Sequence, residues 1–249
     1  MAVQKSLLRL EGTIGGMTFY KSKDGYLVRE KGSVSADRIK KDPSFARTRE
    51  NNEEFRLGVQ ASRLIRSSVP LLLSRAADNT SASRMNSIMI KIGKTDATSA
   101  RGQRNPQTAL ANAVAKALLK SFNFNSNAEI GRILLKQWTI TPATGVIGIA
   151  NLIPATDIIA PIEATHFSLT GGIGVYNFGT GVFDVKYTNI VNSIIGSTLV
   201  PVTLTPTSLP AGTGIKLYFL KLEFFQLVNG VQYALQNCKD NALTIIEVA

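Results

Sequence analysis

The first thirty residues combine β-forming residues with interspersed glycines. Residues 7–20 are rich in β-formers, and the run Lys23-Asp24-Gly25 is a strong turn signal before residues 26–30. This pattern predicts a β-hairpin over residues 7–30 with Asp24 and Gly25 at the turn. A lone two-stranded hairpin is marginally stable in water and exposes both edges. We therefore expect it either to complete the sheet of its own chain or to pair with another copy.

Helical periodicity replaces this pattern after residue 42. Asp42 and Pro43 are typical of a helix start, as N-cap and first-turn residue, and no proline follows until after Ser68. Two further helices are predicted over residues 83–92 and 106–121, because capping residues precede the first and alanine and leucine dominate the second. We expect about three helices. The apolar side of the first helix is formed by Leu57, Ala61, Leu64 and Ile65.

Short apolar runs separated by turn residues fill the chain beyond residue 123, which is typical of an antiparallel sandwich. The clearest hairpin joins residues 215–227 to residues 231–235 through Asn229-Gly230, a preferred type I′ pair. Residues 243–248 are predicted to close the sheet. The predicted fold class is α+β: an N-terminal β-hairpin and a basic helical region, followed by an antiparallel, Ig-like β-sandwich.

Charge divides the chain in the same place. Residues 1–125 hold 22 of the 28 Lys and Arg and 10 of the 17 Asp and Glu, a net charge of +12, whereas residues 126–249 have a net charge of −1. We therefore expect two domains, a basic hairpin-plus-helical domain over residues 1–125 and a β-sandwich over residues 126–249. Clustered basic charge attracts polyanions, although it also serves as a solvated surface that keeps a protein soluble.

The single cysteine, Cys238, excludes an intrachain disulfide and a cysteine-built zinc site, which favours a reducing compartment or a particle stabilised by packing. The first ten residues lack the features of a secretory signal, and no apolar run approaches the roughly 20 residues of a spanning helix. We expect a soluble protein in the cytoplasm or in a virion or other particle, extracellular only by a non-standard route.

Catalytic patterns are weak throughout. His166 is the only histidine and falls in a predicted strand, and no nucleophile-elbow motif is present. The glycine runs 12–16 and 171–174 lack the Gly-Lys-Ser/Thr ending of a phosphate loop, and in strands such glycines more often mark a bulge or a close backbone approach. We expect a protein that is not an enzyme, with no cofactor, no metal and no small-molecule substrate.

Arginines repeat every seven residues along the first predicted helix, and other basic residues lie before it and in a loop near residue 100. These side chains could contact phosphates and give salt-sensitive, sequence-independent binding, although Glu50, Glu53 and Glu54 are interleaved with them and no aromatic residues are present to stack bases. The candidate polyanion-binding residues are Lys40, Lys41, Arg47, Arg49, Arg56, Arg63, Arg66, Arg101 and Arg104.

Several blocks resemble a family of uncharacterised Bacteroidota proteins. The most specific block is Gly12-Thr-Ile-Gly-Gly-Met-Thr-Phe-Tyr-Lys21, continuing to Gly32, and the others are residues 45–51, 96–105 and 229–233. The family has no established activity, cofactor or catalytic residue, so no role is carried over to any position. The resemblance implies a bacterial or bacteriophage source.

The preferred hypothesis is a structural protein that assembles with copies of itself into a filament, a lattice or a particle, by β-strand addition between subunits. The candidate assembly residues are Thr13, Ile14, Met17, Phe19, Tyr20, Tyr26, Val28, Leu243, Ile245 and Val248. The alternative is a nucleic-acid-binding or packaging protein that uses the basic helices. A third reading is an unrecognised enzyme or a carbohydrate-binding sandwich with Trp138, Tyr176 and Tyr187 as stacking residues.

Overall fold

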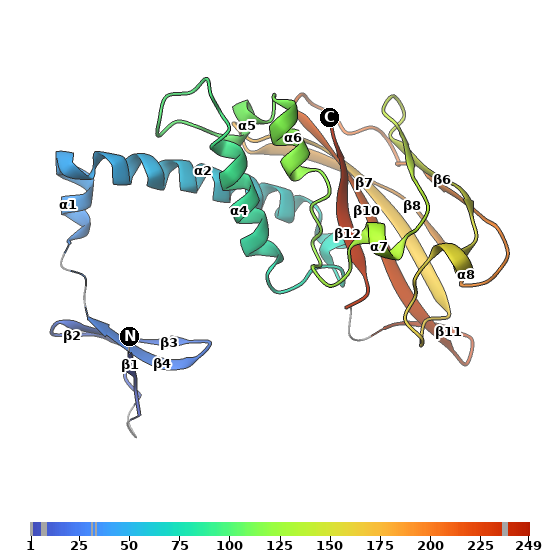
Figure 1. Ribbon diagram of the computed structural model, residues 1–249, viewed down its shortest axis with the longest axis horizontal. Coiled ribbons are helices and arrows are strands. Elements are labelled where there is room, and N and C mark those ends of the chain that lie inside the picture. The colour runs from blue at the N-terminus through green and yellow to red at the C-terminus, as the bar shows by residue number, and fades with distance from the viewer. Residues whose placement is uncertain (1, 6–8, 31, 33, 236–238) are drawn as a thin grey trace. The chain divides into compact units, whose positions relative to one another are not determined.

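The computed structural model describes residues 2–5, 9–30, 32, 34–235 and 239–249. The chain is mixed α/β, with antiparallel sheets and eight α-helices among these residues, and it divides into two compact units, Met1–Glu50 and Asn51–Ala249 (Figure 1). Leu7 and Leu8, where the predicted hairpin begins, and Cys238 lie outside the described residues.

The smaller unit contains a four-stranded antiparallel sheet in the order β1-β4-β3-β2, where the sequence predicts two strands. Its strands are β1 Ala2–Val3, β2 Gly12–Ile14, β3 Met17–Ser22 and β4 Gly25–Glu30. Ser22 pairs with Gly25, so the turn consists of Lys23 and Asp24 rather than Asp24 and Gly25. Gly25 instead begins β4 with φ +108°, a conformation that favours glycine.

Polar caps begin the helices that follow. In α1 (Ala36–Lys41) the Ser35 hydroxyl accepts a hydrogen bond from the Arg38 amide, and in the short 3-10 helix Pro43–Phe45 the Asp42 carboxylate accepts one from Ser44. That 3-10 turn leads directly into α2 (Ala46–Ser68), so the predicted start and end of this helix are confirmed.

Among its described residues, the larger unit contains six further helices, of which α4 is the longest. These are α3 Pro70–Leu73, α4 Ser81–Gly93, α5 Pro106–Ala109, α6 Ala113–Leu119, α7 Ile130–Ile133 and α8 Pro154–Asp157. The prediction of one continuous third helix is wrong, because Asn112 separates α5 from α6. Its side-chain oxygen accepts a hydrogen bond from the Val114 amide, and this N-cap begins a new helix.

Two sheets make up the rest of the larger unit. Its strands are β5 Thr139–Thr141, β6 Val146–Leu152, β7 His166–Asn177, β8 Val182–Ile194, β9 Val200–Leu204, β10 Ile215–Val228, β11 Val231–Ala234 and β12 Ala242–Val248. The large sheet runs β11-β10-β7-β8 with β12 paired to the first half of β10, and the small sheet runs β5-β6-β9. Asn229 and Gly230, with φ of +51° and +80°, form the predicted two-residue turn.

The large sheet separates two hydrophobic cores. Leu217 and Phe219 of β10 pack in a core with residues of α2, α4 and α6, whereas Tyr218 and Leu220 pack on the other face with β6 and β9. Figure 1 shows α4, α5 and α6 beside one face of this sheet and β6 beside the other. Helices and strands therefore share one unit, and the compact units divide at Glu50 rather than at the expected residue 125. Antiparallel sheets are confirmed, while an Ig-like arrangement stays a prediction.

Two glycines let both layers approach β7 closely. The register of β7 and β8 shifts between Thr170 and Gly172, which is the bulge that glycines in a strand often mark. A Cβ at Gly171 would lie 3.0 Å from Ile147 of β6 and 2.9 Å from Thr188 of the neighbouring strand β8, and one at Gly172 would lie 2.8 Å from Leu72 of α3. Side chains at these two positions would overlap with residues of the small sheet on one face and of the helical layer on the other.

Candidate functional site

The sheet of the smaller unit carries most of the predicted assembly residues. Antiparallel partners share a face, and here Ile14 pairs with Met17, while Phe19 pairs with Val28. Alternation along β3 and β4 brings Tyr26 to the same side. We call these five residues the apolar sheet face. Thr13 and Tyr20 lie on the opposite face, where the Arg29 guanidinium sits 5.5 Å from the Tyr20 ring.

This sheet has no core of its own. Ile14 and Met17 are 61% and 54% exposed, Phe19, Tyr26 and Val28 are only half-buried, and no described residue of Met1–Glu50 is buried. A sheet gains its stability by burying one face against another layer. Basic groups border the apolar sheet face, since Arg9 and Lys21 lie 5.0 and 5.8 Å from the Tyr26 ring.

The predicted end strand occupies a different setting. Leu243 and Ile245 are fully buried, and Val248 is 6% exposed, in the core between the large sheet and the helices. One edge of β12 pairs with β10, and on its other edge the Ile245 amide donates to the Phe122 carbonyl at 3.0 Å. This strand therefore completes its own sheet, which is the alternative to strand donation.

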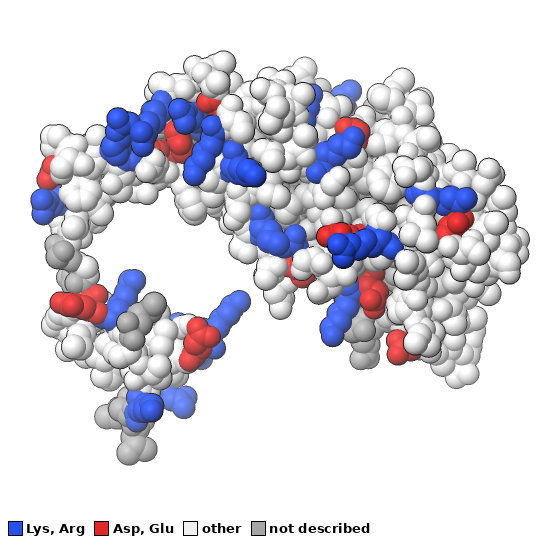
Figure 2. All heavy atoms as spheres, in the orientation of Figure 1, with Lys and Arg blue, Asp and Glu red and all other residues white. Residues whose placement is uncertain are grey.

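Most of the predicted polyanion-binding residues of α2 already have partners. Arg56 donates to the Glu53 carboxylate at 2.8 Å, which lowers the pKa of Glu53 and raises that of Arg56. Arg47 pairs with Glu50 at 3.6 Å, and Arg49 donates to carbonyl oxygens of residues 39 and 42. Figure 2 shows acidic atoms interleaved with the basic ones along this helix.

The remaining candidates differ in how available they are. Lys40, Lys41 and Arg63 are exposed and form no ion pair with any described residue, whereas Arg66 donates to the Ser62 hydroxyl at 3.5 Å. Arg63 also borders a groove of about 370 Å³ between α2 and the turn that joins β7 to β8. Among the α2 arginines of the larger unit, Arg63 is therefore the most accessible to a ligand.

The loop with Arg101 and Arg104 is held in place by two carboxylates, buried Asp96 and half-buried Glu54. The Asp96 carboxylate accepts hydrogen bonds from Thr98, Ser99 and Asn105, and Glu54 of α2 accepts one from the Gly102 amide at 2.7 Å. Burial alone would raise the pKa of Asp96, but the hydrogen bonds from Ser99 and Thr98 lower it. Arg101 is exposed, and the Nε atom of Arg104 is buried without a hydrogen-bond partner among the described residues.

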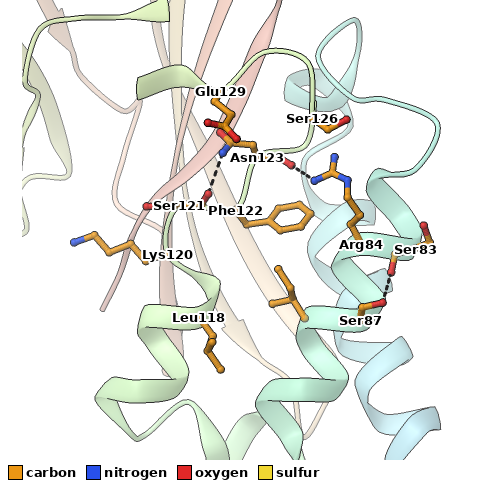
Figure 3. Close-up of a pocket in the computed structure, with 11 residues that line it drawn as sticks. Ser83, Arg84, Ser87, Leu118, Lys120, Ser121, Phe122, Asn123, Ser126 and Glu129 are labelled. Atoms are coloured by element: carbon orange, nitrogen blue, oxygen red, sulfur yellow. Dashed lines mark hydrogen bonds between the residues drawn. The ribbon is translucent and has the colours of Figure 1, made fainter. Parts of the chain in front are cut away.

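A pocket of about 520 Å³ lies between α4 and the segment that follows α6 (Figure 3). Its apolar floor is formed by Ile88, Leu118 and Phe122. Arg84 crosses the Phe122 ring at 5.3 Å and donates to the carbonyls of residues 123 and 124 and to Asp78. Lys120 pairs with Glu247 at 2.7 Å.

The polar side chains of this pocket are engaged by neighbouring groups of the fold. The Ser83 and Ser87 hydroxyls donate to the Thr80 and Ser83 carbonyls, and the Glu129 carboxylate pairs with Arg132 at 2.9 Å. Sequence reasoning missed this pocket, because its lining residues are spread over residues 83–129 and carry no motif. Its polar side chains stabilise the junction between α4 and the strand region.

The structure also places the histidine and the aromatic residues that the sequence singled out. The His166 Nδ1 atom lies 2.9 Å from the Thr165 hydroxyl, within a half-buried strand end. In the part of the chain that the structure describes, no three His, Cys, Asp or Glu side chains gather where they could hold a metal ion, and no helix is long and apolar enough to cross a membrane. Tyr176 is fully buried and Tyr187 and Trp138 are half-buried.

Comparison with protein-family models, with curated proteins and with solved structures finds no match to this chain.

Proposed function

We propose that this chain is a non-enzymatic structural subunit that assembles with further copies of itself, and that the apolar sheet face is one of its contact surfaces. The observation that supports this is a four-stranded sheet of which no described residue is buried. About 50 residues without a core are too few to be stable alone without staples, a metal or a partner. A second copy supplies the missing layer.

β-Strand addition is the finer form of this proposal. β2 pairs with β3 on one side only, and its three residues are exposed. An incoming strand would gain main-chain hydrogen bonds along this edge, while Ile14 and Met17 would meet apolar side chains of the neighbour. The end strand β12 is the less suitable donor because both of its edges are in use.

The test compares two double substitutions on adjacent positions of β3. Met17→Ser with Phe19→Ser removes apolar surface from the apolar sheet face, and Thr18→Ser with Tyr20→Ser alters the opposite face of the same strand. Sedimentation velocity of the full, nuclease-treated chain over a wide concentration range is the measurement. The first variant should lose higher oligomers at concentrations where the wild type and the second variant keep them.

Two results would overturn the proposal. One is a wild-type chain that stays monomeric at every concentration, and the other is a Met17→Ser, Phe19→Ser variant that assembles as the wild type does. Electron microscopy of the wild-type sample then shows whether the oligomers are filaments, lattices or closed particles.

Polyanion binding by the larger unit is a second candidate function. Residues 51–125 hold 11 Lys and Arg against 4 Asp and Glu, and Arg63 is exposed without an ion pair among the described residues. Arg63→Glu should therefore weaken binding to double-stranded DNA at low salt more than Arg56→Glu, since Arg56 is already engaged by Glu53. Equal effects, or binding that does not weaken with salt, would contradict this candidate.

A further inference from the structure

β8 forms one edge of the large sheet, and residues 190–194 at its C-terminal end form an open stretch of that edge. Its inner side pairs with β7 along its whole length. On its outer side the Asn189 amide donates to the Thr205 carbonyl at 3.1 Å, and the Tyr187 carbonyl accepts from Thr207 at 3.2 Å. From Ile190 to Ile194, no outward main-chain hydrogen bond forms with any described residue.

The direction of the open groups follows from the ladder. The Ile195 amide donates to the Thr165 carbonyl at 2.9 Å, so residue 195 bonds toward β7. Alternation in an antiparallel pair then turns the main-chain groups of Ile190, Asn192 and Ile194 away from β7. Three successive donor and acceptor sets therefore point toward the exterior of the sheet.

Nothing in this half of β8 protects the edge. Sheet edges are usually guarded by charged residues, proline or a bulge. The first half of β8 has Asp184 and Lys186, and a register shift separates Tyr187 from Ile190. Residues 190–194 contain no charge, no proline and no glycine. Ile190 and Ile194 are 64% and 58% exposed.

The sequence of this open stretch is complementary to itself. We propose that two copies of the chain pair through the outer edges of β8, antiparallel and centred on Asn192. In this register Ile190 lies opposite Ile194 of the other copy, and Asn192 lies opposite its own counterpart. Each residue whose main-chain N–H and C=O point outward then lies opposite a residue of the other copy whose N–H and C=O also point outward, so the two can form hydrogen bonds. The result is one continuous sheet across a two-fold axis, in which the same patch contributes from both sides.

Neighbouring registers fit less well. Centring the pair on Ile190 would bring Ile194 against Lys186 of the other copy and would run into residues 187–189, whose outer side is already bonded. Centring it on Ile194 would use residues beyond the end of the strand. Only the register centred on Asn192 uses the whole open stretch.

The central asparagine does not bring an unsatisfied amide into this contact. Its Nδ2 donates to the Gln232 Oε1 at 2.9 Å, and the Gln232 Nε2 donates back to its Oδ1 at 3.2 Å. The side-chain amide is thus satisfied within the subunit, and the main-chain groups of Asn192 remain for the partner. This inference rests on the proposed self-assembly but concerns a second contact surface.

Disulfide trapping in the full-length chain tests the register. Cys238→Ser removes the native thiol, and single cysteines are then introduced as Asn192→Cys or Ile190→Cys. Facing Cα atoms in a hydrogen-bonded pair are about 5.5 Å apart, within disulfide range, whereas the Cα atom of residue 190 would be about 14 Å from that of its own counterpart. Asn192→Cys should form a covalent dimer under mild oxidation, and Ile190→Cys should form one only when mixed with Ile194→Cys. Equal trapping of Asn192→Cys and Ile190→Cys would overturn the proposal.

A second pair of variants measures the contact without oxidation. Asn192→Pro removes an outward amide that the β7 ladder does not use, and Asn192→Ala loses the same Gln232 contact but keeps the amide. In sedimentation velocity, Asn192→Pro should lose this dimer and Asn192→Ala should keep it, and a dimer that persists in Asn192→Pro would overturn the proposal.

The background variant Met17→Ser with Phe19→Ser separates the two proposals. If it still yields the Asn192→Cys dimer, the β8 contact is upheld whatever the outcome for the apolar sheet face. If the wild type assembles through the apolar sheet face but Asn192→Cys is not trapped, only the β8 contact is wrong.

Discussion

The ammonium group of Lys221 donates to the Ser74 carbonyl at 2.7 Å and to the Leu71 carbonyl at 3.2 Å. Lys221 is 4% exposed on β10, and these carbonyls end the short helix α3. Its charge is matched by Glu223, whose carboxylate lies 3.0 Å away. The buried ammonium group of Lys221 thus links the helical layer to the large sheet through hydrogen bonds.

Lys221→Met should lower the free energy of unfolding by about 3 kcal/mol, because the Glu223 carboxylate and two carbonyls lose their partner. Lys216→Met on the same strand is the matched control, since Lys216 is exposed and should change stability by less than about 0.5 kcal/mol. Urea denaturation of both variants is the measurement. Equal stabilities would contradict the role given to Lys221.

Gly58 sets how closely α2 and α4 approach. A Cβ at this position would lie 2.7 Å from the Ile90 Cγ1 and 3.0 Å from the Ile90 Cα, and the latter cannot rotate away. Gly58→Ala should therefore destabilise the protein by about 2 kcal/mol, even though alanine favours helix by about 1 kcal/mol. At Gly93 the nearest atom is 3.7 Å away, so Gly93→Ala should be neutral or stabilising in thermal unfolding.

Asp78 makes the stability of the larger unit depend on pH in the acid range. Burial alone would raise the pKa of Asp78, but hydrogen bonds from Ser126 and Thr80 hold it well below its usual range. Because the folded-state pKa lies below the unfolded one, its stabilisation is present above the ordinary carboxyl range and is lost as pH falls through it. Asp78→Asn should cost about 2 kcal/mol at neutral pH and flatten the fall in stability below about pH 4.

The measurement is urea denaturation from pH 7 to pH 3. Asp24→Asn, in an exposed turn, serves as the control and should keep the wild-type pH profile. An Asp78→Asn profile as steep as that of the wild type would show that other carboxylates cause the acid sensitivity.

Hydrogen exchange should distinguish the two units. Amides of β3 and β4 belong to a sheet without buried residues, so in dilute protein they should exchange far faster than amides of β7 and β10. At concentrations where oligomers form, β3 and β4 should become protected. Strong protection of β3 at high dilution would mean that another part of the same chain covers the apolar sheet face.

Local signals allowed parts of this fold to be predicted. Asn229-Gly230 requires positive φ at both positions, and Asp42 with Pro43 begins a helix through contacts between neighbours, so each depends on adjacent residues alone. Of the assembly residues predicted in this region, the sheet brings Ile14, Met17, Phe19, Tyr26 and Val28 to one face but Thr13 and Tyr20 to the other.

Long-range pairing could not be predicted in the same way. Ala2 pairs with Val28, and Leu243 receives a hydrogen bond from Phe124 across more than a hundred residues, so neither the extra strands of the small sheet nor the covered edge of β12 has a local signature. The pairing of Arg56 with Glu53, by contrast, is a local contact that the interleaved glutamates of the sequence already indicated.

The close contact of Leu72 with Gly172 restricts the order in which these two positions can be substituted during evolution. A side chain at Gly172 requires the Leu72 side chain to move or residue 72 to become smaller, and a smaller residue 72 alone leaves a void. On the opposite face, a Cβ at Gly171 would lie 3.0 Å from Ile147 of β6. Substitutions along β7 are therefore expected to appear in relatives as coupled pairs, one member on the strand and the other in the layer that it touches.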